Sequence, residues 1–186
     1  MYPKSYVDYL VHFHGDRDYF ECHEILEDYW KDHEPGNKNS IWAAFIQLAV
    51  GCYHYRRGNA PGAQRTLHKA LAIFHGQKKK LDSLGIHTDE LLSELEEFIS
   101  SLSAGRAYKS FIIPIKDPKL KELCLDACVE KGFNWCRSDY FPTEAIIDRH
   151  KTRDRTSVIE EREMALKRKN QIQELGNKQK ESAGND

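Results

Sequence analysis

Three side chains able to bind a metal ion or transfer a proton lie close together in the sequence, at His23, Glu24 and Glu27. Residues four apart share one face of an α-helix, so His23 and Glu27 could hold a metal ion or exchange a proton. Glu24 lies about 100° further round the helix and is less well placed. The alternative is a core histidine hydrogen-bonded to Glu27, because buried polar groups need partners. We favour this structural role and expect no metal ion and no cofactor.

A second polar group lies on the most apolar segment, residues 41–57. Gln47, Gly51 and His54 form one stripe at helical spacing, with Ala43 beside it. These side chains could line a pocket that faces the first group. Alternatively, Ala43 and Gly51 admit a neighbouring helix while Gln47 and His54 bond to loop carbonyls. We favour the second interpretation, because buried side-chain hydrogen bonds are usually structural.

Five cysteines could indicate a zinc site, but the spacing of the last three and His150 matches no common structural class. We interpret all five as small apolar side chains. The N-terminus shows no signal-peptide pattern. Cysteines in such a chain predict reduced thiols and a cytoplasmic location. No apolar run approaches the roughly 20 residues that span a bilayer, so we expect no membrane association.

Charge is balanced over the whole chain, with 28 basic and 29 acidic residues and a net charge of −1. Residues 16–34 nevertheless carry eight acids and two bases, and residues 56–80 carry seven bases and no acid. We expect these two segments to neutralise each other within one domain. Residues 149–155 are basic and could bind an RNA backbone. The mixed charges around them favour a solvated helix junction instead. A nucleic-acid partner is therefore not expected.

Capping residues and apolar spacing predict the helices that must position these groups. Helices are predicted over residues 18–33, 41–57, 60–80, 88–102 and 118–132, with N-caps at Asp18, Ser40, Asn59 and Asp117. The second of these is apolar nearly all round, which is typical of a buried central helix. They predict an all-α fold, with a compact bundle of four to five helices over residues 3–103.

The composition changes after residue 103, which we take as the end of the bundle. Residues 1–103 are expected to fold alone. Residues 104–175 are predicted to form an irregular and helical C-terminal extension, with an extended run at 111–113 and a charged helix over 156–175. Residues 176–186 are predicted to be a disordered tail.

Three motifs follow one another over about 60 residues: YFECHEILEDYW at Tyr19–Trp30, FIQLAVGCYHYRRGN at Phe45–Asn59 and GAQRTLHKAL at Gly62–Leu71. They resemble the family called domain of unknown function 309. Its motif positions correspond here to His23, Glu24, Glu27, Trp30, Gln47, Leu48, Ala49, His54, Gly58, Asn59 and Ala63. The resemblance implies a compact all-α domain and no established activity, and it does not extend to residues 104–186.

The same central segment is also similar to a tetratricopeptide hairpin. Gly51, Ala63, Leu67 and Ala70 fall at the spacing of the small and apolar packing positions of that motif. Only one repeat is visible, whereas such arrays need about three to be stable. We therefore expect a tetratricopeptide-like packing of two helices and not a tetratricopeptide protein.

No phosphate loop, nucleophile elbow or dinucleotide fingerprint is present in the sequence. We therefore predict a non-enzymatic module that binds a partner protein or itself. One alternative is a small metal-dependent or acid/base enzyme that uses His23, Glu27 and His54, which would also be the ligands of any metal. The other is an RNA-associated protein that uses the bases of residues 56–80 and 149–155.

Both polar groups contribute to the candidate site. Its members are His23, Glu24, Glu27, Trp30, Gln47 and His54. If the first predicted helix packs on the central one, His23, Glu27, Gln47 and His54 should converge beneath Trp30.

Overall fold

Hydrogen-bonded caps begin four of the helices, at the residues that the sequence indicates. In the computed structural model, which describes residues 1–136 and 142–147, the Asp18 carboxylate accepts a hydrogen bond from the Glu21 N–H at 3.0 Å. Ser40, Asn59 and Asp117 accept equivalent bonds from the first turns of their helices. The helices that follow these caps are α2 (Tyr19–His33), α3 (Ile41–Arg56), α4 (Ala60–Gly76) and α7 (Pro118–Glu130).

All regular secondary structure in the described residues is helical, so the predicted all-α fold is confirmed. The other helices are α1 (Lys4–His14), α5 (Lys78–Ser83), α6 (Thr88–Ser103) and α8 (Glu144–Ile147). The one β-interaction in this part of the chain is an isolated antiparallel bridge between Ile86 and Ile115. None of these helices is long and apolar enough to cross a membrane.

The segment 60–80 is two helices and not the single helix that the sequence predicts. α4 ends at Gly76, and the chain leaves helical geometry at Gln77, where φ is −119° and ψ is 24°. Glycine is a poor helix former, which weakens the helix at this point. The Gln77 side-chain amide donates to the Asn39 carbonyl at 3.0 Å, so a contact with the loop between α2 and α3 accompanies the break.

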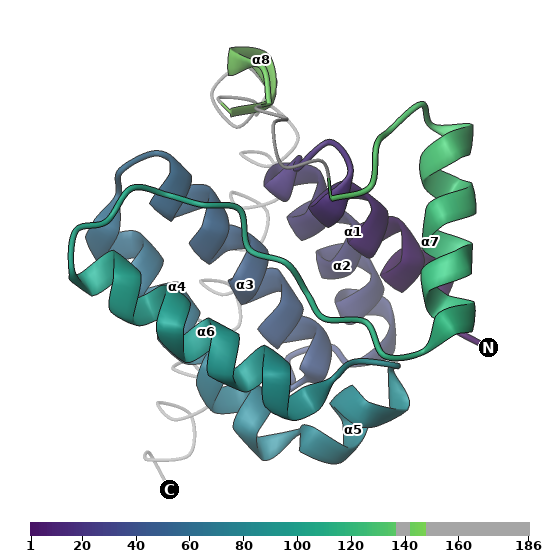
Figure 1. Ribbon diagram of the computed structural model, residues 1–186. Coiled ribbons are helices and arrows are strands. Elements are labelled where there is room, and N and C mark those ends of the chain that lie inside the picture. Colours follow the sequence, from purple (N-terminus) through teal and green to yellow (C-terminus); the bar gives the residue numbers. More distant parts are fainter. Residues whose placement is uncertain (137–141, 148–186) are drawn as a thin grey trace, which may run out of the picture. The chain divides into compact units, whose positions relative to one another are not determined.

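α3 lies at the centre of the bundle, with α2 on one side and α4 on the other (Figure 1). Eleven of its 16 residues are buried, which agrees with its apolar sequence. α4 packs directly over Gly51, where an added Cβ would lie 2.4 Å from Leu67 Cδ2. Glycine at this position therefore lets the two helices form the tetratricopeptide-like hairpin.

Residues 104–117, here called the strap, run across the bundle from the end of α6 to α7 (Figure 1). The Ile113 N–H donates to His14 Nε2 at 3.0 Å, and the Lys116 N–H donates to the Gly85 carbonyl at 2.8 Å. Gly85 has φ +76°, and a Cβ there would lie 2.6 Å from Tyr2 Oη. The strap is thus attached to α1 and to the turn between α5 and α6.

The strap and α7 contribute to the same hydrophobic core as the first six helices. Phe111 and Ile113 of the strap and Leu120 and Cys124 of α7 are buried within it. The predicted boundary at residue 103 therefore lies within one continuous core. Three predicted segments lie outside the described residues: the basic segment 149–155, the charged helix over 156–175 and the tail over 176–186.

Candidate functional site

A pocket of about 470 Å³ lies between α2, α3 and α4, and we call it the motif pocket. Its apolar lining comes mainly from α3 and α4, and its polar lining from all three helices and the loop between α2 and α3. The lining residues are His23, Glu27, Trp30, Lys38, Asn39, Ala43, Ile46, Gln47, Lys69, Ala72 and Ile73. A volume of this size is within the range of ligand pockets, about 300–1,000 Å³.

Four of the six residues predicted from the sequence line this pocket: His23, Glu27, Trp30 and Gln47. Glu24 is not in the lining, but its carboxylate lies against His23. The Trp30 indole N–H donates to the Asn37 carbonyl at 3.0 Å, which ties the end of α2 to the following loop. With Lys69 of the third motif also in its lining, the pocket joins side chains from all three sequence motifs.

His23 is half-buried and pairs with Glu24, not with Glu27 as the sequence analysis expects. His23 Nδ1 lies 3.1 Å from Glu24 Oε1. Glu27 instead pairs with Lys31, with Nζ and Oε2 3.3 Å apart. A glutamate four residues before a lysine is a favourable helix pair, which explains this alternative partner. The expected buried histidine is thus a partly exposed one at the wall of the pocket.

The walls of the motif pocket carry opposite charge. Glu27 lies on α2, and Lys69 lies on α4, on the other side of α3. Lys38 adds a second exposed ammonium group from the loop. Between them Ala43 and Ile46 of α3 present an apolar surface. The acidic and basic segments predicted to neutralise each other therefore border one pocket.

His54 does not line the motif pocket. Its Nδ1 lies 3.0 Å from the Asn59 side-chain nitrogen, near the end of α3. Because an amide N–H₂ group can only donate, Nδ1 is the acceptor in this pair. Partial burial, followed by the positive charges of Arg65 and Arg57, lowers the pKa of His54 and favours the neutral ring. The expected convergence beneath Trp30 thus includes three of the four polar residues.

The five cysteines are free, and four of them are buried in helices. Burial raises the pKa of the Cys124 thiol to about 12 and that of the Cys128 thiol to about 11. With such pKa values these thiols stay protonated at neutral pH and are poor nucleophiles.

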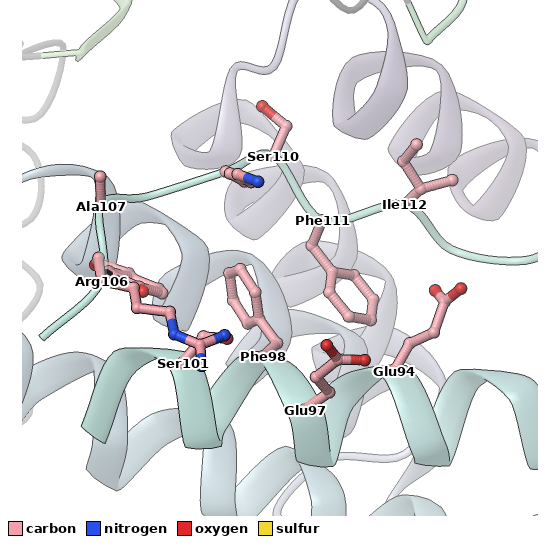
Figure 2. A pocket seen from close by; sticks show the side chains of 11 residues that line it. Glu94, Glu97, Phe98, Ser101, Arg106, Ala107, Ser110, Phe111 and Ile112 are labelled. Carbon is pink, nitrogen blue, oxygen red and sulfur yellow. Dashed lines mark hydrogen bonds between the residues drawn. The ribbon is translucent and has the colours of Figure 1, made fainter. Parts of the chain in front are cut away.

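A second pocket, of about 450 Å³, lies between α6 and the strap, and we call it the strap pocket. Figure 2 shows the carboxylates of Glu94 and Glu97 directed from α6 toward the strap, beside the rings of Phe98 and Phe111. Partial burial, then the charges of Glu90 and Glu97, raises the pKa of Glu94. This pocket was not predicted from the sequence, because one of its walls is the strap, which has no helical periodicity. The three-residue spacing of Glu94 and Glu97 was the available signal.

Two comparisons with known proteins give matches, one to a family and one to a relative. Residues 6–66 match the model of the domain of unknown function (DUF309), a range that includes all of α2 and α3. The chain is 44% identical over 169 residues to the uncharacterized protein YpuF of Bacillus subtilis (strain 168), covering 91% of this chain and 97% of that protein. No solved structure matches the chain. The family match over all of α2 and α3, together with this relative, shows that the chain belongs to the domain of unknown function 309 family.

Proposed function

We propose that this protein is a non-enzymatic binding module that holds a segment of a partner protein in the motif pocket. The observation that carries the proposal is the composition of the pocket, an apolar surface between walls of opposite charge. The segment that fits this composition has one large apolar side chain, with a basic residue on one side and an acidic residue on the other.

The apolar part of the pocket supports recognition of a side chain. Ile46 of α3 is buried, and Ile73 of α4 and Trp30 of α2 are half-buried around it. An aliphatic or aromatic side chain placed here would remove apolar surface from water on both partners. Residues of this kind in a desolvated centre carry most of the affinity in protein interfaces.

The charged walls support specificity and orientation. A basic residue of the partner would face Glu27 on α2, and an acidic residue would face Lys69 on α4. Complementary charges at a rim steer association and reject partners of the wrong sign more than they add affinity. The partner segment would therefore bind in one direction only.

The two alternative functions gain less support from the geometry. An acid/base site of His23, Glu27 and His54 is disfavoured because His54 bonds to Asn59 and does not line the pocket. An RNA backbone at Lys69 would meet the carboxylate of Glu27 in the same pocket. Phosphate binding is weakened by such a neighbour.

A displayed library of random peptides, selected on the full-length protein, tests the proposal. We expect enriched peptides with an apolar residue between a base and an acid, and binding should change the fluorescence of Trp30. Lys69→Glu should reverse the preference at the acidic position of the peptide and select a base there. Enrichment of sequences without this pattern, or a Lys69→Glu variant that selects the same peptides, would refute the proposal.

Two variants, each with one alanine replaced by tryptophan, control for non-specific binding. Ala72 is exposed and lines the motif pocket, so Ala72→Trp should fill the pocket and abolish peptide binding without unfolding the chain. Ala104 is exposed and lies outside both pockets, so Ala104→Trp should leave binding unchanged. Equal binding by both variants would place the peptide elsewhere.

A further inference from the structure

Three metal-ligating side chains of α2 lie together at the wall of the motif pocket. His23, Glu24 and Glu27 each offer one ligand atom, and these atoms all lie within 4.8 Å of one another. Among the residues that the structure describes, this is the one group of three His, Cys, Asp or Glu side chains with such spacing. We propose that this group binds one Zn²⁺ ion.

The ligand types fit zinc. Zn²⁺ takes imidazole nitrogen and carboxylate oxygen at about 2.0–2.2 Å, and a site with three protein ligands leaves a fourth position open. At such bond lengths, tetrahedral ligand atoms are about 3.4 Å apart. His23 Nδ1 and Glu24 Oε1 are already 3.1 Å apart, so Glu27 is the side chain that must move inward.

The pocket supplies the open position. His23 and Glu27 both line the cavity, so an ion between them would face it with its fourth coordination site. A water molecule or an oxygen of a bound ligand has room to complete the coordination there. This observation is independent of the donor spacing, and it distinguishes the group from an acidic cluster on an open helix surface.

Lys31 competes with the metal for Glu27. Lys31 Nζ lies 3.3 Å from Glu27 Oε2, and the side chains are 54% and 33% exposed. Exposed ion pairs of this kind stabilise little, so a divalent ion can displace the lysine. Lys31→Ala should therefore strengthen zinc binding, whereas a purely structural role of Glu27 gives no reason for such an effect.

A bound ion would occupy Glu27, which faces the basic residue of the partner in the proposed function, so the zinc site is tested separately, without peptide. The experiment titrates Zn²⁺ alone into the full-length, metal-free protein in competition with a chromophoric zinc indicator. We expect one ion per chain and at least a tenfold loss of affinity in His23→Gln and in Glu27→Gln. Zn²⁺ should also raise the melting temperature of the unmodified chain and not that of these variants.

Matched controls use other possible ligands of the chain. His12 and Asp16 form a similar histidine–carboxylate pair, with Nδ1 and Oδ1 3.1 Å apart, but without a third ligand. His12→Gln should therefore retain full zinc affinity. The Co²⁺-substituted protein should show no thiolate charge-transfer band, because no cysteine belongs to the site. Unchanged zinc affinity in folded His23→Gln, or a thiolate band with Co²⁺, would overturn the assignment.

Discussion

The motif pocket and the strap pocket have nearly the same volume, about 470 and 450 Å³, but they are built in different ways. The motif pocket is lined by helices consecutive in the chain and the loop between two of them. The strap pocket has α6 on one side and an irregular segment on the other. The first is stabilised by helix packing, and the second depends on hydrogen bonds that join residues far apart in sequence. A perturbation of the strap should therefore affect one pocket before the other.

Removal of the strap and α7 gives the largest expected effect. A fragment of residues 1–103 lacks Phe111, Ile113 and Leu120, which are buried in the core. Each buried side chain of this size stabilises by about 1.5–3 kcal/mol, so the loss approaches the roughly 5–15 kcal/mol of a typical domain. We expect the fragment to melt at a much lower temperature and without cooperativity, contrary to the expectation from sequence. Calorimetry of this fragment and of a fragment of residues 1–147 compares their melting temperatures. Equal melting temperatures would show that the bundle is independent of the strap.

Acidification should loosen the strap while the motif pocket persists. Burial lowers the pKa of His14 from 6.5 to about 4, with Arg17 adding to the effect. Nδ1 bonds to the Leu10 carbonyl, and Nε2 accepts the Ile113 N–H, so the folded protein needs the neutral ring.

The sign of this pH dependence follows from proton binding. Between pH 6.5 and 4 the unfolded chain binds a proton at His14 that the folded chain does not, so stability falls as pH falls through this range. The loss is at most about 3–4 kcal/mol, at roughly 1.4 kcal/mol for each unit of pKa shift. Hydrogen exchange should show the Ile113 amide opening before the amides of α3 beside the motif pocket do. His14→Phe should be less stable at neutral pH and lack this slope, and an unchanged slope would assign the effect to another group.

A larger side chain at the contact between α3 and α4 should distort the motif pocket directly. A Cβ at Gly51 would lie 2.4 Å from Leu67 Cδ2, so Gly51→Val forces the helices apart. We expect a loss of about 1–3 kcal/mol in the free energy of unfolding, as for other overpacked cores. Gly76→Ala is the matched control, because no atom lies within 4 Å of its added Cβ, and it should stabilise by roughly 0.5–1 kcal/mol. Urea unfolding measures the free energy of unfolding of both variants. An equal loss in both would contradict the prediction.

Reductant should have the smallest effect, because all five cysteines are free. The melting temperature should be the same with and without reductant, and denatured protein should react with five equivalents of a thiol reagent. A fall of several degrees on reduction would reveal a disulfide in one of the two regions.

Local features of the fold were predictable from sequence, and long-range ones were not. The caps at Asp18 and Ser40 and the buried character of α3 follow from residue types within one or two turns. The course of the strap depends on partners such as His14 and Ile113, which are 99 residues apart. No periodicity in residues 104–117 indicates such a partner.

The residues of the candidate site also differ in how well the sequence predicted their positions. His23, Glu27 and Gln47 share a pocket because helical spacing turns them toward the contact between α2 and α3. Helical angle alone placed Glu24 too far from His23, because it ignores the reach of a flexible glutamate side chain. His54 lies at the end of α3, and its partner Asn59 comes from the cap of the next helix. Side-chain conformation, and not helical spacing, decided these two cases.

The attachment of the strap to α1 also sets an order of folding events. Tyr2 bonds to Asp117, and His14 bonds to Ile113, at sequence separations of 115 and 99 residues. Closing such long loops is slow compared with pairing neighbouring helices such as α3 and α4. During synthesis, α1 can pack on α2 and α3 early, since Tyr9 bonds to the Phe45 carbonyl, but its contacts with the strap and α7 must wait for about one hundred further residues. We expect the segment from α1 to α4 to form first, with the strap and α7 docking as the final step.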